Sequence, residues 1–315
     1  MTGDEMPESR WSAAVVGAGG VGGLLGAALA RAGHSVVYVA RPDTMAALNS
    51  SGLHVRSAQF GEFHVPAQAV ARLAGPVDVC LVAVKAMSLD AALAGVPAEA
   101  LGDGLVLPML NGVEHMTALR AHFPAAQVVA GAIRVESTRV AAGRIEHTSP
   151  FSGIEVASDT APRERLDALA AQLRRAGLDV TVRDDEAGLL WDKLALLAPL
   201  ALLTTHADAP AGVVRDQRRA DLETVVGEVA AVALAAGARV DPTTILGMFD
   251  RVPAGMKSSM QRDAEANRPT ELDAIGGAVL RAARRHGIDT PVTARLVNEL
   301  RAAKPATSTS RSRRQ

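Results

Sequence analysis

The chain has 315 residues, of which 48% are hydrophobic, 21% charged and 3% aromatic, and its formal net charge is −1. This composition is typical of a globular protein, and the length favours two domains because a domain holds roughly 100–200 residues. A net charge near zero and few aromatic side chains argue against nucleic acid or an anionic membrane as a partner.

Cysteine and histidine usage excludes two further classes. The single cysteine, Cys80, rules out a disulfide framework within one chain and a zinc site built from thiolates. The eight histidines show no close metal-ligand spacing, so no metal is predicted. The first dozen residues lack the apolar core of a signal peptide, and no segment approaches 18 uninterrupted apolar residues. We therefore expect a cytoplasmic protein.

The first part of the chain alternates short apolar runs with turn signals, the pattern of an α/β sheet. The predicted elements in chain order are a strand at 13–16, a helix at 23–32, a strand at 35–40, a helix at 44–49, hairpin-like strands near 53–55 and 62–65, strands at 77–84 and 104–109, a strand at 128–135 that continues the sheet, and an antiparallel pair of strands within 144–157.

From Asp184 onward the strand pattern vanishes and long helices dominate. The predicted helices are 186–205, 220–237, 242–249, 258–267, 271–286 and 291–303. We therefore expect a Rossmann-type dinucleotide-binding domain over residues 1–183 and an all-helical domain over 184–305. Residues 306–315 are rich in Ser, Thr and Arg, and they are expected to form a disordered tail.

A glycine-rich loop follows the first strand directly. It reads Gly17-Ala18-Gly19-Gly20-Val21-Gly22, and it has a strand before it, a helix after it and a second strand about 20 residues on. Gly17 permits the tight turn, Gly19 lets the backbone approach a pyrophosphate, and Gly22 lets the helix and the strand pack closely. The helix N-terminus then offers N–H groups to the phosphates. A glycine-rich turn in another α/β fold is the alternative, but the context favours a dinucleotide site.

The residue at the end of the second strand indicates which nicotinamide cofactor is used. An NAD site places Asp or Glu there to bind the ribose 2′-hydroxyl, whereas this chain has Arg41. A guanidinium matches a 2′-phosphate in charge and in bidentate geometry, so NADPH is the predicted cofactor. Asp43, two residues on, is interpreted as a cap on the following helix.

Lys85 and Asn111 follow two of the predicted parallel strands, at the edge where α/β sheets place ligands. Each also has a simpler interpretation. Lys85 is consistent with an exposed lysine at a strand end, and Asn111-Gly112 is a strong turn pair. Their position at the same sheet edge as the glycine loop favours a role in the ligand-binding site.

Three polar segments stand out in the helical part. Lys193 lies in a heavily apolar helix, where it must extend to solvent, pair with a carboxylate such as Glu186, or face a cleft as a proton donor. Ser258 or Ser259 is consistent with a helix cap. Thr270 and Asp273 are consistent with a capping box in which Glu271 favours the helix dipole.

Taken together, these pieces resemble the ketopantoate reductase (2-dehydropantoate 2-reductase) family over residues 12–303. The resemblance rests on the order and spacing of the Gly-x-Gly-x-x-Gly loop, Val84-Lys85, Leu110-Asn111-Gly112-Val113, Leu190-Trp191-Asp192-Lys193-Leu194, Ser258-Ser259-Met260 and Thr270-Glu271-Leu272-Asp273.

The resemblance implies an NADP-dependent oxidoreductase that reduces a 2-oxo acid to a 2-hydroxy acid, with its active site between the two domains. It also implies that Lys193 is the general acid, that Glu271 binds the substrate hydroxyl and that Ser259 holds the substrate carboxylate. Asn111 and Lys85 would then contribute to the cofactor and substrate sites. A homodimer is left open.

Two positions depart from the family pattern. Members commonly carry asparagines four and eight residues after the catalytic lysine, and this chain has Leu197 and Ala201 there. A bulkier or more apolar 2-oxo acid than ketopantoate is therefore a plausible substrate. Two alternatives remain open: a non-catalytic NADP(H)-binding sensor, and a related dehydrogenase with an amino-acid or opine-type substrate.

Overall fold

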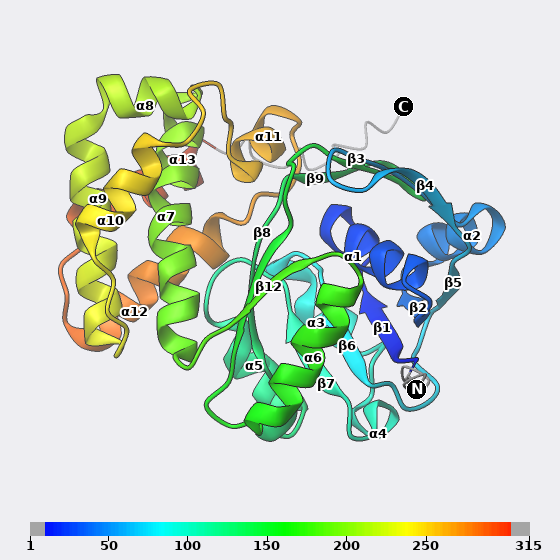
Figure 1. Ribbon diagram of the computed structural model, residues 1–315. Coiled ribbons are helices and arrows are strands. Elements are labelled where there is room, and N and C mark those ends of the chain that lie inside the picture. The colour runs from blue at the N-terminus through cyan, green and yellow to red at the C-terminus, as the bar shows by residue number, and fades with distance from the viewer. Residues whose placement is uncertain (1–9, 304–315) are drawn as a thin grey trace, which may run out of the picture. The chain divides into compact units, whose positions relative to one another are not determined.

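The structure is a computed structural model that describes residues 10–303, so the predicted tail at 306–315 lies outside the described residues. The chain forms two compact units that divide between Leu190 and Trp191. The boundary falls inside one continuous helix, α7 (Glu186–Ala207) (Figure 1).

The first unit is organised around a parallel sheet with the strand order β5-β2-β1-β6-β7. Its strands are β1 (Ser12–Val16), β2 (Ser35–Val39), β5 (Gln68–Val70), β6 (Val79–Val82) and β7 (Leu105–Pro108). The register aligns Val16 with Val39 on one side and with Val82 on the other, so these strands end at the same edge. The chain builds outward from β1 and then returns to place β6 beside it, which makes the space between β1 and β6 the topological switch point.

Alternate residues of each strand enter different apolar cores, which explains the continuous apolar runs in the sequence. In β1, Ala13 and Val15 pack into one core with α1, whereas Ala14 and Val16 pack into the other with Leu89 and Leu119. Cys80 is fully buried in the second core, and burial raises the pKa of its thiol to about 12. The thiol therefore stays protonated at neutral pH and is not a nucleophile.

Six α-helices and two short 3₁₀ turns accompany these strands in the described part of the first unit. They are α1 (Gly20–Arg31), α2 (Pro42–Ser51), α3 (Leu89–Leu93), α4 (Ala98–Leu101), α5 (His115–His122) and α6 (Arg163–Arg175), with short 3₁₀ turns η1 (Ala86–Ser88) and η2 (Ala125–Gln127). Pro42 opens α2, where a helix tolerates proline because that N–H has no partner within the helix. Helices α3, α4, α5 and α6 were not predicted.

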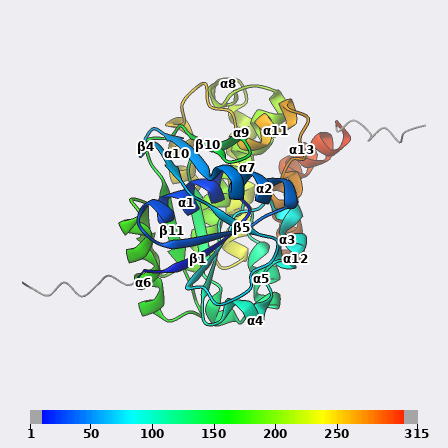
Figure 2. The same cartoon turned by 90° about the vertical axis from the view of Figure 1, so that its right-hand side faces the viewer.

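Two smaller sheets complete the first unit. One has the order β4-β3-β10-β9, from β3 (Leu53–Ser57), β4 (Gly61–Val65), β9 (Ser137–Ala141) and β10 (Arg144–His147). It packs on α1, whose other side contacts β1 and β2 (Figure 2). The other has the order β12-β11-β8, from β8 (Ala130–Arg134), β11 (Gly153–Ala157) and β12 (Asp179–Val182).

The prediction of an antiparallel pair within residues 144–157 is wrong. Strand β10 pairs with β3 and β9, while β11 pairs with β8 and β12. The two strands belong to different sheets: β10 forms a hairpin with the preceding β9 and also lies beside the distant β3, whereas β11 lies between β8 and β12. The strand expected at 128–135 was predicted to continue the main sheet, but β8 belongs to another sheet, and this segment joins the main sheet only through one parallel bridge, between Val106 and Val128, two residues before β8 begins.

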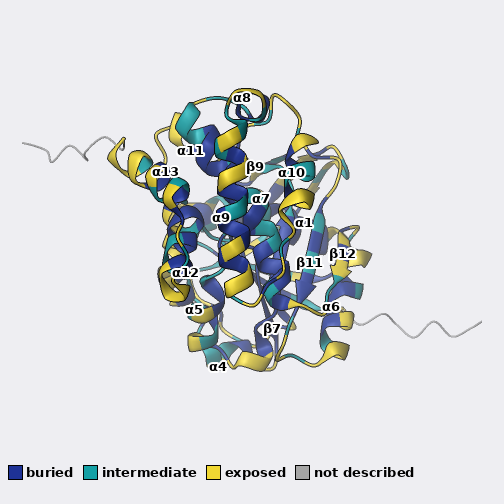
Figure 3. Cartoon of the chain, turned by 90° about the vertical axis from the view of Figure 1, so that its left-hand side faces the viewer, coloured by how far each residue is buried: buried dark blue, intermediate teal, exposed yellow. Residues whose placement is uncertain are grey.

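The described residues of the second unit form helices joined by loops, without strands. After α7 come α8 (Ala211–Gln217), α9 (Arg219–Ala235), α10 (Pro242–Asp250), α11 (Ser259–Glu265), the π-helix η3 (Asp273–Gly277), α12 (Ala278–His286) and α13 (Pro291–Ala302). Helix α9 contacts α8, α10, α12 and α13 and carries buried and exposed faces (Figure 3). The sequence did not predict α8, nor the π-helical turn inside the helix expected at 271–286.

Helix α7 meets the length and hydropathy of a membrane-spanning segment, and 67% of its most apolar stretch is buried in the protein. The core helix of a globular protein has the same composition, because a helix that is apolar nearly all round is covered on all sides. We interpret α7 as such a core helix.

Candidate active site

The glycine loop joins β1 to α1 at the carboxyl edge of the parallel sheet, at its switch point. Gly17 has a φ of +95°, and its N–H donates to the Val39 carbonyl at the end of β2, 3.1 Å away. A Cβ on Gly22 would lie 2.1 Å from the Gly17 carbonyl oxygen and 3.1 Å from Val15 Cγ1. The backbone turn therefore requires Gly17, and the close packing of α1 on the sheet requires Gly22.

Gly19 is glycine for a different reason. Its φ is −80°, which any residue adopts, and a Cβ there would meet only the Ala83 carbonyl oxygen, at 4.0 Å. Neither the backbone nor the packing of the protein requires glycine at this position. A ligand lying against the loop would require it, because a side chain would occupy the same space. The loop, with buried Ala18 and half-buried Val21, thus fits a dinucleotide whose phosphates meet the first N–H groups of α1.

Arg41 lies at the end of β2, as expected, and is the N-cap residue of α2. Its side chain makes no capping hydrogen bond and is exposed. Asp43, which was interpreted as a cap, is instead an exposed residue within the first turn of α2. Its carboxylate lies near the helix N-terminus, where a negative charge is favourable.

Lys85 and Asn111 lie in matching positions. Lys85 comes three residues after Val82, the last residue of β6, and Asn111 three residues after Pro108, the last residue of β7. Both side chains are half-buried. Because β6 and β7 are parallel neighbours, both residues lie at the edge of the glycine loop. Gly112 has a φ of +86°, so the turn predicted at Asn111-Gly112 is present as well.

Lys193 lies near the middle of α7, half-buried, between the buried side chains of Trp191 and Leu194. Glu186 is not its partner, since that carboxylate accepts from Arg120 and from the Asp159 N–H. Leu197 and Ala201 are four and eight residues further on, on the same helix face as Lys193. Leu197 is half-buried and Ala201 is fully buried.

The two adjacent serines have distinct roles. Ser258 is the N-cap of α11: its Oγ accepts from the Gln261 N–H at 3.0 Å and lies 2.9 Å from Thr204 Oγ1 on α7. Ser259 is the first residue of α11, and its side chain is exposed. Because Ser258 supplies the cap, the hydroxyl of Ser259 is not needed for it.

Glu271 is half-buried and immediately precedes the helix that begins at Leu272. The structure shows no capping hydrogen bond between the described residues Thr270 and Asp273, and the Asp273 carboxylate accepts from Arg281 and Arg301 instead. After Leu272, residues 273–277 form the π-helix η3, a rare geometry that often occurs at functional sites. Gly276 lies in this turn, where a Cβ would come 2.5 Å from Val297 Cγ2.

The structure thus places the expected residues in two groups. The glycine loop, Arg41, Lys85 and Asn111 gather at one edge of the parallel sheet in the first unit. The second unit carries Lys193 on α7, Ser259 at the start of α11 and Glu271 before η3.

Two residues that the sequence did not single out lie beside the glycine loop and beside the start of α2. Ser137 Oγ on β9 donates to the Gly20 carbonyl oxygen at 2.9 Å, and Arg139 Nη1 donates to Thr44 Oγ1 at 3.3 Å. Both come from a strand that was not predicted. The available signal was weak: Ser137, Thr138 and Arg139 are all polar and show no alternation, and only the β-branched Thr138 and Val140 and the turn at Gly143 indicate a strand.

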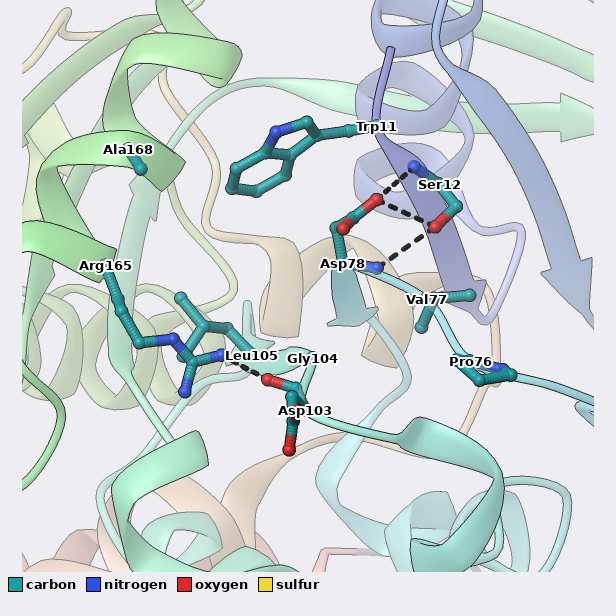
Figure 4. Close-up of a pocket in the computed structure, with 10 residues that line it drawn as sticks. All are labelled: Trp11, Ser12, Pro76, Val77, Asp78, Asp103, Gly104, Leu105, Arg165 and Ala168. Atoms are coloured by element: carbon teal, nitrogen blue, oxygen red, sulfur yellow. Dashed lines mark hydrogen bonds between the residues drawn. The ribbon is translucent and has the colours of Figure 1, made fainter. Parts of the chain in front are cut away.

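A pocket of about 440 Å³ lies at the opposite, amino edge of the sheet (Figure 4). Its polar groups bond to one another. Asp78 Oδ2 accepts from the N–H and the hydroxyl of Ser12, and the Arg165 guanidinium bonds the Asp103 carbonyl. Ligands of α/β sheets bind at the carboxyl edge, so we do not assign the reaction to this pocket.

A parallel sheet with a glycine loop at its switch point, followed by a helical unit, defines the class of two-domain dinucleotide-binding proteins. The family model "Ketopantoate reductase PanE/ApbA" matches residues 13–158, and its C-terminal counterpart matches residues 187–304. The chain belongs to the ketopantoate reductase family, a family of nicotinamide-dependent enzymes. It is an oxidoreductase.

Known relatives span nearly the whole chain. A 2-dehydropantoate 2-reductase of Mycobacterium tuberculosis is 30% identical over 300 residues, covering 92% of this chain and 97% of the relative. The crystal structure of a 2-dehydropantoate 2-reductase from Geobacter metallireducens is 29% identical, with a TM-score of 0.84 and coverage of 93% and 99%. A D-mandelate dehydrogenase solved with NADH and anilino(oxo)acetate has the same fold, at 23% identity, a TM-score of 0.84 and coverage of 92% and 97%.

Proposed function

We propose that this protein reduces a 2-oxo acid to the 2-hydroxy acid with NADPH, and that Lys193 is the general acid. The assignment of a dinucleotide cofactor rests on Gly19, a glycine that the protein's own turn and packing do not require. Arg41 supports NADPH over NADH, because it places a guanidinium where NAD sites carry a carboxylate.

When bound, NADPH supplies the hydride. The protein's own residues handle the proton and hold the substrate. Lys193 holds a proton toward the carbonyl oxygen and releases it as negative charge develops there, and solvent then reprotonates the amine. Its position on a long apolar helix supports this role, since a fixed donor needs little reorganisation.

Ser259 and Glu271 orient the substrate in this proposal. The exposed hydroxyl of Ser259 donates to the substrate carboxylate, and Glu271 accepts from the hydroxyl of the product. Lys85 and Asn111, at the sheet edge, complete the cofactor and substrate contacts. The support is the matched placement of the two residues after β6 and β7.

Leu197 and Ala201 support a substrate more apolar than ketopantoate. An amide at either position would bind a polar substituent of the acid, and a leucine or alanine leaves that substituent unpaired. One lost hydrogen bond weakens binding by about 1–3 kcal/mol, which is one to two decades in affinity. We therefore propose a 2-oxo acid with a hydrocarbon or aromatic substituent.

The test is NADPH oxidation by the purified protein, followed by absorbance, with a panel of 2-oxo acids. The panel holds ketopantoate, 2-oxoisovalerate and phenylglyoxylate, and the expected result is the highest kcat/KM for one of the last two. Nucleotide binding without turnover of any member would refute the reductase and favour an NADP(H) sensor. Turnover only with an added amine would favour the opine-type reaction.

We also propose that the enzyme works in the cytoplasm as a homodimer. A ketopantoate reductase from Staphylococcus aureus, 18% identical with a TM-score of 0.79, is described as dimeric. Light scattering coupled to size-exclusion chromatography tests the dimer, and a monomer mass would refute it.

A further inference from the structure

Strand β9 presents one of its faces to α1. It is the outer strand of its sheet and pairs antiparallel with β10, with Ser137 opposite His147 and Arg139 opposite Ile145. Directly opposite residues of an antiparallel pair project to the same face, as do alternate residues of one strand. The side chains of Ser137 and Arg139 therefore leave the sheet on the face that carries Ile145.

That face packs on α1 at the glycine loop. A Cβ on Gly23 would lie 2.6 Å from Ile145 Cδ1, and a Cβ on Gly20 would lie 2.2 Å from the Ser137 carbonyl oxygen. The Ser137 hydroxyl also donates to the Gly20 carbonyl. The start of β9 is thus held against the first residue of α1.

Two residues further on, the same strand reaches α2. Arg139 Nη1 lies 3.3 Å from Thr44 Oγ1, and Thr44 is the third residue of α2, whose N-cap residue is Arg41. This long hydrogen bond uses one of the five N–H donors of the guanidinium. Among residues 10–303, neither Arg41 nor Arg139 has a carboxylate within 4.0 Å that would neutralise it.

The second arginine changes the net formal charge at the start of α2. Arg41 and Asp43 alone sum to zero formal charge in the first turn of α2, which would not favour a 2′-phosphate. A phosphate monoester carries about −1.5 to −2 at neutral pH. Arg139 makes the local sum positive, and its planar fork can bind two phosphate oxygens.

We propose that Arg139 is a second cation for the 2′-phosphate of NADPH, reaching from β9 to the start of α2 while Arg41 approaches from the end of β2. The proposal rests on the NADPH site of the proposed function and adds a specificity-determining residue to it. Strand β9 then follows the cofactor, from the pyrophosphate beside Gly20 to the 2′-phosphate beside Thr44.

The test measures Kd for NADPH and for NADH by nucleotide fluorescence, in the absence of substrate. For R139Q we expect Kd for NADPH to rise about tenfold, the loss of one charge-assisted hydrogen bond at an exposed site, with Kd for NADH unchanged. R139K should retain part of the preference. The matched control is R144Q, which removes an equal charge from an exposed position on β10 and should change neither Kd.

Adenosine 2′,5′-bisphosphate and AMP serve as competing probes, and R139Q should weaken only the first. T44V removes the hydroxyl that Arg139 contacts but keeps the guanidinium charge. Its Kd values therefore separate a structural effect of this contact from the effect of the charge. Equal weakening of NADPH and NADH by R139Q, or no change in either, would overturn the proposal. A wild-type protein that binds neither nucleotide would instead refute the proposed cofactor site itself.

Discussion

Arg120 Nη2 and Glu186 Oε2 lie 2.7 Å apart and join α5 to the first residue of α7. The Glu186 side chain is 7% exposed and that of Arg120 is 28% exposed. The same carboxylate oxygen also accepts from the Asp159 N–H at 3.3 Å. The helix that carries Lys193 is therefore anchored at its N-terminus by a buried carboxylate with two donors.

Removing the cation from this pair should destabilise the protein. In R120M the Glu186 carboxylate stays buried with only one amide donor, and we expect the free energy of unfolding to fall by about 1–3 kcal/mol. Urea denaturation measures the change. The control is R163Q, which breaks two exposed ion pairs, with Asp167 and with Asp184, and should leave the midpoint where it was. Equal midpoints for R120M and wild type would contradict the anchoring role.

Glu228, a residue of α9, caps the N-terminus of α13. Its carboxylate accepts from the N–H groups of Val292 and Thr293, each at 2.8 Å, and from the Thr293 hydroxyl at 2.6 Å. These donors belong to the first turn of α13, where N–H groups lack partners within the helix. We expect E228A to lower the free energy of unfolding by about 2–3 kcal/mol, measured in urea, because several buried donors lose their acceptor. A loss no larger than that of the exposed E223A would show that water replaces the carboxylate.

Replacing the proposed general acid should separate binding from chemistry. For K193M we expect kcat to fall about 10²- to 10⁴-fold, because no proton donor remains beside the carbonyl oxygen. The Kd for NADPH, measured by fluorescence, should stay within about twofold of wild type under the same proposal. The neighbouring substitution D192N, on the same helix, is the control for general damage to α7. Parallel losses of binding and turnover would exclude the assigned role.

His147 makes stability depend on pH. Its ring is buried, with Nδ1 2.8 Å from Ser57 Oγ and Nε2 3.1 Å from the Phe151 carbonyl oxygen. Ser57 Oγ accepts from the N–H groups of Gln59 and Phe60, so we infer that its proton goes to Nδ1 and that the ring is neutral. Burial lowers the pKa of His147 below its ordinary value of 6.5.

The unfolded chain therefore binds a proton at a higher pH than the folded chain does. The contribution of His147 to the free energy of unfolding should be complete above the pKa that the residue has in the unfolded chain. It should fall as the pH drops below about 6.5 and level off once the pH is below the pKa in the folded protein. Urea midpoints across this range test the slope, and H147N should be less stable at neutral pH but flatter below it. His34, whose pKa burial also lowers, should preserve part of the slope in the variant. If the slope of stability against pH is unchanged in H147N, another titratable group causes the pH dependence.

Much of the fold and half of the candidate site were predictable because the signals are local. The strand, loop and helix around Gly17 to Gly22 are encoded by neighbouring residues, through turn geometry and apolar periodicity. Helix α7 and the serine cap of α11 follow from the same kind of short-range preference. The positions of Lys85 and Asn111 also followed, because each comes just after an apolar strand.

The parts that sequence could not supply depend on contacts between distant residues. The Arg120–Glu186 pair spans 66 residues, and the bond from Thr293 to Glu228 spans 65. Strands β10 and β11 were wrongly paired because alternation shows that a strand exists but does not name its partner. The π-helical turn beside Glu271 also has no distinct sequence pattern.

The sequence alone thus determined a dinucleotide loop, a basic residue at the end of β2 and a family of oxidoreductases. Only the tertiary structure decided that Gly19 is free of packing demands, that Ser258 rather than Ser259 is the cap, and that Arg139 lies beside the start of α2. The reason is physical: backbone preference acts over a few residues, whereas burial and cross-strand pairing join segments far apart in the chain.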